Sequence, residues 1–292
     1  MPELSPFGFR HTKAKVGDVN LHYVIGGSGD PLVLLHGFPE TSHQWRKVMP
    51  ALAERFTVLA PDQRGCGFSD KPPGGYDAWT MAADIDALTT QLGFERYFIV
   101  GHDMGAPVAL CHAARYPEKV HGLVYLDEPL PGFNVEHMAR FAPDNPSMVW
   151  WYPFHMAPDL AELLIAGKER AYIDYFIDQH THLMDPDAID DATRAIYARH
   201  LAGAGGVHGA IGWYRAVFET AQHIRRIGET KLTLPVLGIN GEFGVPDVGK
   251  QMAAVATDVT SAVVKGSGHF VAEEHPEALV EQLLAFFDAN ED

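Results

Sequence analysis

Residues 101–105, with the sequence Gly-His-Asp-Met-Gly, constrain the fold of this chain more than any other stretch. They follow a largely apolar run at 96–100, which is typical of a buried β-strand, and they precede residues 106–114, which predict the first turns of a helix. In so sharp a turn the neighbouring segments pass close by, so a Cβ atom at Gly101 or Gly105 would clash. The pattern therefore predicts a strand–turn–helix corner that presents the side chain of Asp103 at its tip.

An aspartate at such a tip favours one kind of chemistry. A carboxylate is a poor match for acyl transfer from esters or amides, but it can displace a leaving group from an sp3 carbon and form an alkyl ester on the protein. A halide and the alkoxide of an opening epoxide both fit as leaving groups. Water must then hydrolyse the ester, and a histidine must activate that water. Because short motifs also arise by chance, a loop without a catalytic role is the alternative.

Length and composition limit the function classes that need to be considered. With 292 residues, of which 47% are hydrophobic and 21% charged, the sequence predicts one large domain, or a core domain with an inserted piece. The formal net charge of −16 argues against binding to nucleic acid or to an anionic membrane surface. No signal peptide is evident, and no stretch approaches the ~20 apolar residues needed to span a bilayer. We therefore expect a soluble, cytoplasmic protein in which Cys66 and Cys111 are free thiols.

Short apolar runs alternate with amphipathic stretches over most of the chain. We expect a hairpin over residues 12–25, further strands at 31–35, 57–60, 96–100, 120–126, 234–240 and 261–265, and helices at 41–54, 78–92, 248–256 and 276–287. This alternation implies an α/β fold with a mostly parallel, doubly wound sheet. It breaks after Pro129. Residues 130–228 are helix-like and rich in Trp, Tyr, Met and His, which predicts a helical cap inserted into a core formed by residues 1–129 and 229–292.

His269 is the candidate base. It stands in a glycine-flanked loop between the last predicted strand and the last helix, and in folds with this kind of corner the catalytic histidine comes last in chain order. The chain contains 16 histidines, so most of them, such as His112 and His200, are expected to serve packing or the surface.

A carboxylate that orients the base has two candidate positions. Asp127 ends the strand at 120–126, and we favour it over Glu242, which follows the next strand but is out of register with the usual acid position, residue 244. Glu128 is a weaker candidate, because successive residues at a strand end point to opposite sides. The alternative for Glu242 is a solvated loop charge.

Residues 36–39, with the sequence His-Gly-Phe-Pro, predict the second arm of an oxyanion site. The backbone N–H groups of Phe38 and Met104 can donate to the nucleophile and then to the tetrahedral intermediate of ester hydrolysis. His36 belongs to the same candidate binding set. The Phe38–Pro39 peptide bond is expected to be cis in this tight corner. The alternative is that residues 36–39 only pack against the corner and donate no hydrogen bond during catalysis.

Together these stretches resemble the Asp-nucleophile branch of the α/β-hydrolase superfamily over nearly the whole chain. That branch contains epoxide hydrolases, haloalkane dehalogenases and haloacetate dehalogenases. The supporting marks are residues 36–39, the stretch 62–70 (Asp-Gln-Arg-Gly-Cys-Gly-Phe-Ser-Asp), residues 101–105 and Gly268-His269. They are highly specific for the superfamily and less specific for the substrate.

The residue after the nucleophile separates the members of this branch. Haloalkane dehalogenases carry a halide-binding Trp there, and haloacetate dehalogenases carry Arg there and again three residues later. In this chain the two positions are Met104 and Pro107. A small anionic acid would therefore lack its usual clamp, and the negative net charge would disfavour its approach.

The predicted cap carries the acids that epoxide opening needs. Residues 212–215, Gly-Trp-Tyr-Arg, resemble the Trp-Tyr-Arg segment of epoxide hydrolases, which implies that Tyr214 donates to the opening oxygen. Haloacetate dehalogenases share a Tyr-Arg here, so Tyr214 alone does not separate the two activities.

The second donor position falls within residues 150–155, Trp-Trp-Tyr-Pro-Phe-His. Cif-type bacterial epoxide hydrolases, which resemble this chain also in the acid after strand six and in the run 164–170, place a histidine where this chain has Trp150. An indole N–H does not usefully give up its proton, so Tyr152 or His155 replaces that histidine, or ring opening relies mainly on Tyr214. Trp151 resembles the halide-binding Trp of haloacetate dehalogenases. Packing within the cap is the alternative for this aromatic cluster.

The sequence thus predicts an epoxide hydrolase in which Asp103 attacks, Tyr214 protonates, and His269, oriented by Asp127, activates water. The partner is a small-molecule epoxide or organohalide, and no metal or organic cofactor is expected, since we find no ligand cluster or phosphate loop. Dehalogenation with the same nucleophile is the alternative activity, and a non-catalytic small-molecule sensor is the alternative of another class. The oligomeric state stays open, with a homodimer among the options.

Overall fold

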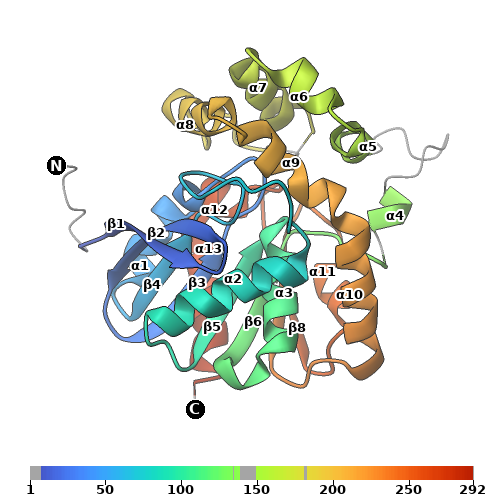
Figure 1. The fold of residues 1–292 in the computed structure, drawn as a ribbon. Coiled ribbons are helices and arrows are strands. Elements are labelled where there is room, and N and C mark those ends of the chain that lie inside the picture. Colours follow the sequence, from blue (N-terminus) through green and yellow to red (C-terminus); the bar gives the residue numbers. More distant parts are fainter. Residues whose placement is uncertain (1–7, 134, 139–148, 181–182, 292) are drawn as a thin grey trace.

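The centre of the molecule is an eight-stranded sheet in the order β1-β2-β4-β3-β5-β6-β7-β8 (Figure 1). The computed structural model describes residues 8–133, 135–138, 149–180 and 183–291. The strands are β1 (Arg10–Val16), β2 (Val19–Gly27), β3 (Asp30–Leu35), β4 (Phe56–Pro61), β5 (Tyr97–His102), β6 (Val120–Leu126), β7 (Val236–Gly241) and β8 (Val259–Val264). β2 pairs antiparallel with β1 and β4, and the other neighbours are parallel. The predicted mostly parallel α/β sheet is confirmed.

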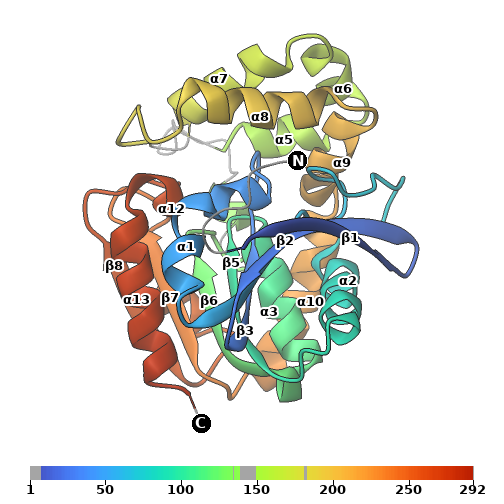
Figure 2. The same ribbon diagram turned by 90° about the vertical axis from the view of Figure 1, so that its left-hand side faces the viewer.

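The sheet is covered on both faces, which explains why its inner strands are continuous apolar runs. Along β5, Ile99 belongs to one core cluster and Val100 to the other. Figure 2 shows α2 (Ala78–Gln91), α3 (Gly105–Arg115) and α10 (Val217–Thr230) on one side, and α1 (Met49–Leu52) and α13 (Pro276–Asp288) on the other. Phe287 of α13 is fully buried against the second cluster. Cys66 and Cys111 are buried free thiols, as predicted.

One predicted helix is divided. Instead of a single helix over 41–54, a 3-10 helix, η1 (Ser42–Lys47), is followed by the short α1. Pro50 lies in the first turn of α1, where its missing N–H costs no hydrogen bond, whereas inside a longer helix it would break the backbone ladder. The helix expected at 248–256 is also shorter: α11 spans Val248–Met252, and the chain continues as turns.

Between β6 and β7 the described residues form helices and no strand. They are α4 (Val135–Met138), α5 (Trp151–Met156), α6 (Leu160–Ile165), α7 (Glu169–His180), α8 (Asp191–Ala202), α9 (Gly206–Arg215) and α10. Helices α5 to α9, here called the cap helices, lie beyond the carboxyl ends of the strands in Figure 1, while α10 packs against α2 and α3 beside the sheet. The domain bounds at 130 and 228 stay a prediction. No described helix is both long and apolar enough to cross a bilayer.

Candidate active site

Asp103 stands at the corner between β5 and α3, as the sequence predicts. Its backbone has a φ of 48°, a left-handed conformation that is unusual for a residue with a side chain. A Cβ atom added to Gly101 would lie 2.4 Å from the Gly105 carbonyl oxygen, and one added to Gly105 would lie 2.5 Å from the His36 carbonyl oxygen. Glycine is therefore required on both sides of the turn. The Asp103 side chain is buried at the tip, with 8% of the residue exposed.

The corner places Asp103 beside His269. Nε2 of His269 lies 3.4 Å from Oδ2 of Asp103, and Nδ1 of His269 lies 2.9 Å from Oδ1 of Asp127. The three residues come from segments far apart in the chain, and they meet because the carboxyl ends of parallel strands lie along one edge of the sheet. The side chains that the sequence nominated as nucleophile, base and orienting acid are thus within contact of one another.

Asp127, and not Glu242, contacts the histidine. The Asp127 carboxylate is fully buried and accepts hydrogen bonds from the N–H groups of Gly241 (2.6 Å) and Val245 (3.0 Å). A Cβ atom at Gly244 would come within 2.2 Å of it, so the missing side chain at residue 244 leaves the space that this carboxylate fills. Glu242 is exposed, and its carboxylate accepts from the Lys265 ammonium and from the N–H of Gly266 in the loop after β8.

The charges of the three residues are coupled. Burial alone would lower the pKa of His269, but its hydrogen bonds with Asp103 and Asp127 and their negative charges raise it well above the ordinary value. Burial would likewise raise the pKa of Asp103, but the bond and the charge of His269 lower it. The resting site therefore holds an imidazolium between two carboxylates.

The loop at 36–39 reaches the nucleophile through its backbone. The Phe38 N–H donates to Oδ1 of Asp103 at 2.6 Å, and the Phe38–Pro39 peptide bond is cis, as predicted. The Met104 amide follows Asp103 directly, at the N-cap of α3. His36 is fully buried; its Nδ1 donates to the Gly37 carbonyl and its Nε2 accepts from the Gln63 N–H, so its ring supports the loop from within.

Tyr214 lies over this loop. It is 1% exposed, and its ring packs edge-on against Phe38, with a centroid distance of 5.3 Å. Arg215 holds α9 in place, since its guanidinium donates to the His155 carbonyl (3.1 Å) and to both carboxylate oxygens of Glu162 (2.6 and 2.8 Å). Burial and the Asp103 charge raise the pKa of Tyr214 well above its ordinary value, so the phenol keeps its proton.

The aromatic residues at 150–155 divide into two groups by the rings on which they pack. The Trp150 ring packs on Phe154 (5.7 Å) and the Trp151 ring on Phe176 (5.6 Å), both within the cap helices. Tyr152 and His155, by contrast, are buried against the Tyr214 ring, at centroid distances of 5.0 and 4.4 Å.

His155 is a neutral imidazole in this arrangement. Burial and the nearby Arg215 lower its pKa to about 3, and its Nε2 bonds to the hydroxyl of Tyr172. Tyr152 instead extends to the core, where its hydroxyl donates to Oε1 of Glu128 at 3.1 Å and lies 3.9 Å from the Met104 sulfur.

The sequence reasoning missed the role of His102, the residue before the nucleophile. Its Nε2 donates to the His269 carbonyl at 2.9 Å, and its Nδ1 accepts from Gln44 at 2.8 Å, so it ties the base-bearing loop to the corner. The carboxylate of Glu40 is completely buried 3.3 Å from the same ring. Its place inside the corner motif was the only available signal for His102, and no pattern pointed to Glu40.

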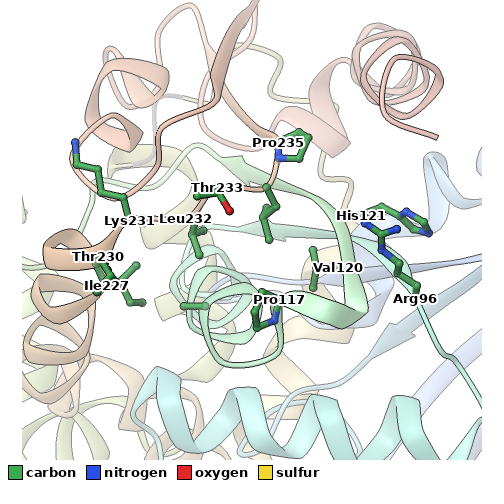
Figure 3. Close-up of a pocket in the computed structure, with 12 residues that line it drawn as sticks. Arg96, Pro117, Val120, His121, Ile227, Thr230, Lys231, Leu232, Thr233 and Pro235 are labelled. Carbon is green, nitrogen blue, oxygen red and sulfur yellow. Dashed lines mark hydrogen bonds between the residues drawn. The ribbon is translucent and has the colours of Figure 1, made fainter. Parts of the chain in front are cut away.

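A pocket on the far side of the core has different chemistry. It has a volume of about 420 Å3 and opens at the amino ends of the strands, where Arg96, Val120 and Pro235 line it (Figure 3). No carboxylate is among its lining residues.

Elsewhere, Asp77, Glu219 and His223 form the one group of described residues that could hold a metal ion; Asp77 already accepts the Thr80 N–H at the start of α2.

Fold and site together define an α/β hydrolase whose corner carries an aspartate. Residues 30–276 match the model of the alpha/beta hydrolase fold family, and the chain belongs to that family. A soluble epoxide hydrolase of Corynebacterium sp. (strain C12) is 35% identical over 279 residues, covering 95% of this chain and 96% of that protein. A fluoroacetate dehalogenase of Burkholderia sp. is 33% identical over 214 residues, covering 72% and 69% of the two chains. The crystal structure of Cfl2 from Burkholderia cenocepacia aligns with a TM-score of 0.92 at 40% identity, over 98% of both chains. The resemblance found in the sequence is confirmed.

Proposed function

We propose that this protein hydrolyses epoxides to vicinal diols through an alkyl ester on Asp103. The observation that carries the proposal is the divided environment of the Asp103 carboxylate: Phe38 N–H holds one oxygen, and the other faces His269, which Asp127 orients. A carboxylate held in this way is preorganised to attack an sp3 carbon. The full-length similarity to a soluble epoxide hydrolase supports the choice of substrate class.

In the first step Asp103 Oδ2 attacks an epoxide carbon and forms a C–O ester bond. The electron pair of the breaking ring bond moves to the epoxide oxygen, which takes a proton from Tyr214. This phenol is buried next to Phe38 and keeps its proton because its pKa is raised by burial and by the Asp103 charge. Proton donation is needed here because an alkoxide is a poor leaving group in a buried site.

In the second step His269 becomes a base. Once Asp103 is esterified, one of the two anions that raised the pKa of His269 is gone, so the imidazolium releases its proton more readily. This proton passes to the phenolate that ring opening left on Tyr214 and restores the phenol. The neutral imidazole then takes a proton from water, and the hydroxide attacks the ester carbonyl. Phe38 and Met104 N–H groups stabilise the tetrahedral oxyanion. As this intermediate collapses, the leaving alkoxide takes the proton of its hydroxyl group, which frees the diol and restores the Asp103 carboxylate.

The proposal is tested with the His269→Gln variant, which should be alkylated but should not hydrolyse its ester. Intact-protein mass spectrometry after mixing with styrene oxide should show a gain equal to the whole epoxide, and peptide mapping should place it on Asp103. The double variant Asp103→Asn/His269→Gln is the control and should show no gain. The proposal would be contradicted if the His269→Gln variant stayed unmodified and the wild-type protein also turned over neither styrene oxide nor an aliphatic epoxide.

Dehalogenation is the second candidate, and the similarity to a fluoroacetate dehalogenase favours it. The same nucleophile would displace a halide, and Trp151 would be the proposed halide ligand. The same His269→Gln experiment with chloroacetate and fluoroacetate separates the two activities. A mass gain equal to the acid minus hydrogen halide, without a gain from epoxides, would assign the protein as a dehalogenase.

A further inference from the structure

Another pocket lies where the cap meets the antiparallel edge of the sheet. Its volume is about 350 Å3, which is within the range of small-molecule sites. The core lines it with His11 of β1, His22 of β2 and residues of η1, and the cap helix α8 lines it with Ile196, Arg199 and His200. In Figure 1 this helix lies above β1 and β2. The candidate nucleophile, base and acid are not among its lining residues, so the pocket is separate from the candidate active site.

A strip of aromatic rings forms part of the pocket's lining. The rings of His11 and His22 stack with a centroid distance of 5.2 Å. Phe68 packs edge-on against His22 at 5.2 Å and against His200 at 4.6 Å. The strip therefore runs from β1 in the core to α8 in the cap. Phe68 is still 52% exposed, so a flat apolar ligand would find open ring surface there.

The one carboxylate among the lining residues, that of Asp62, already has its donors. It accepts hydrogen bonds from Nδ1 of His22 (2.7 Å) and from the N–H groups of Ser42 (2.8 Å) and Phe68 (2.9 Å). Burial alone would raise the pKa of Asp62, but the hydrogen bond and the charge of His22 lower it below its ordinary value. A cationic ligand would therefore have to compete with three existing donors for this carboxylate.

Several donors around the pocket, by contrast, have no acceptor among the described residues. The Arg199 guanidinium forms no hydrogen bond or ion pair with them, and neither do the ring nitrogens of His43 and His200. Burial, followed by the charge of Arg46, lowers the pKa of His43 to about 4, so its imidazole is neutral at pH 7. A neutral imidazole still offers one N–H as a donor.

This excess of donors favours an anionic ligand, although the whole chain has a net charge of −16. Distant charges are screened over about 8 to 10 Å at physiological ionic strength, so the groups in contact with a ligand decide its binding. A carboxylate can accept two parallel hydrogen bonds from one guanidinium, which is a strong and directional arrangement. The aromatic strip beside these donors favours a ligand whose carboxylate is attached to a flat ring.

We propose that this pocket binds an aromatic carboxylate that bridges the core and the cap helix α8. Arg199 binds the carboxylate together with the imidazole N–H groups of His43 and His200, and the aromatic ring of the ligand packs along Phe68. The site is independent of the proposed function, because no step of epoxide hydrolysis involves these residues. It gives the protein a second small-molecule site with the opposite charge preference from the imidazolium-bridged carboxylates around Asp103.

The test measures binding of 2-naphthoate to the full chain by isothermal titration calorimetry at pH 7. The wild-type protein should bind it saturably at one site. The amide 2-naphthamide has nearly the same shape but no charge, and it should bind at least about tenfold more weakly, since hydrogen bonds to charged groups are the stronger ones.

Substitutions place the probe in the pocket. Arg199→Gln removes the charge at an exposed position where folding is not at risk, and it should raise the Kd about tenfold, whereas Arg199→Lys should recover part of the affinity. Phe68→Ala removes open ring surface and should raise the Kd about fivefold. Arg226→Gln, an exposed arginine on α10, is the matched control and should leave the Kd unchanged.

Three outcomes would overturn the proposal. The first is a wild-type protein that shows no saturable binding of 2-naphthoate up to about 1 mM. The second is equal affinity for the carboxylate and the amide, which would show that the pocket does not select an anion. The third is an unchanged Kd in Arg199→Gln together with tighter binding in Asp103→Asn, which would place the probe in the candidate active site.

Discussion

The two halves of the candidate site are held together by different forces. On the core side, Asp103 and Asp127 accept backbone N–H groups at 2.6 to 3.0 Å, and His269 joins them through its ring nitrogens. On the cap side, the rings of Tyr214, Tyr152 and His155 meet in aromatic contacts with centroid distances between 4.4 and 5.0 Å. Strand ends position the charged groups, and helix packing positions the aromatic side chains.

This difference has a functional consequence. Backbone donors at the end of a sheet are rigid and close to the charges, so the core side can preorganise bond-making chemistry. Ring packing depends on the summed contacts of several helices, so the cap side can vary in shape and in proton supply while the nucleophile stays the same. Substitutions should therefore divide into those that abolish the reaction and those that change how readily the opening epoxide is protonated.

The largest effect should come from the nucleophile. Asp103→Asn keeps the acceptor for the Phe38 N–H but removes the attacking carboxylate, so turnover should fall by about 10⁴-fold or more. Steady-state diol formation from styrene oxide measures this, with the mass of the variant checked for deamidation. Turnover within tenfold of wild type would place the nucleophile elsewhere.

The orienting acid should be next. Asp127→Asn leaves the ring of His269 without its anionic partner, and turnover should fall by roughly 10³-fold. Because the attack by Asp103 is less dependent on the base, the alkyl-enzyme should accumulate and be visible by intact mass. Glu242→Gln, an exposed glutamate out of contact with His269, is the matched control and should retain wild-type turnover. The opposite ranking of the two variants would reverse the assignment of the acid.

On the cap side, Tyr214→Phe should affect ring opening selectively. Removing one phenol proton should slow alkylation of Asp103 by about 100-fold, while hydrolysis of a preformed ester should change little. Single-turnover measurements of the two half-reactions separate these effects. Tyr116→Phe, at the far end of α3, serves as the control. Equal slowing of both half-reactions would mean that Tyr214 supports the packing of the site and not proton donation.

The smallest effect concerns stability. Burial raises the pKa of Glu40 from its ordinary value of 4.5 to about 6. The folded state then binds the proton more tightly than the unfolded state does. This contribution is complete below pH 4.5 and is lost as the pH rises through 6, above which the free energy of unfolding should be lower by about 2 kcal/mol. Denaturant unfolding across this range should show that Glu40→Gln lacks this part of the pH dependence. An unchanged slope in the variant would show that Glu40 does not titrate there.

Much of the fold was predictable because its signals are local. The apolar runs identified the inner strands to within a few residues, and chain order placed His269 after the last of them. The prediction of one helix over 41–54 was wrong because it rested on periodicity alone and did not account for Pro50. A proline can stand in the first turn of a helix, but it cannot lie inside a helix that continues through it. The sequence could not show which rings of the cluster at 150–155 pack against Tyr214, because the direction of each ring depends on its contacts with α7 and α9.

What the sequence by itself determined is the corner and its chemistry. Gly101 is required by its contact with the Gly105 carbonyl inside the turn, and an aspartate between the two glycines favours attack on an sp3 carbon. Only the tertiary structure decided which acids complete the site. Asp127 contacts His269 because β6 and β7 lie side by side and residue 244 leaves room, and Glu128 keeps its proton because distant segments bury it beside Asp103. The steric demand at Gly101 acts between neighbours in the chain, whereas the approach of the His36 carbonyl to Gly105 and the charge state of a buried carboxyl depend on groups that only folding brings together.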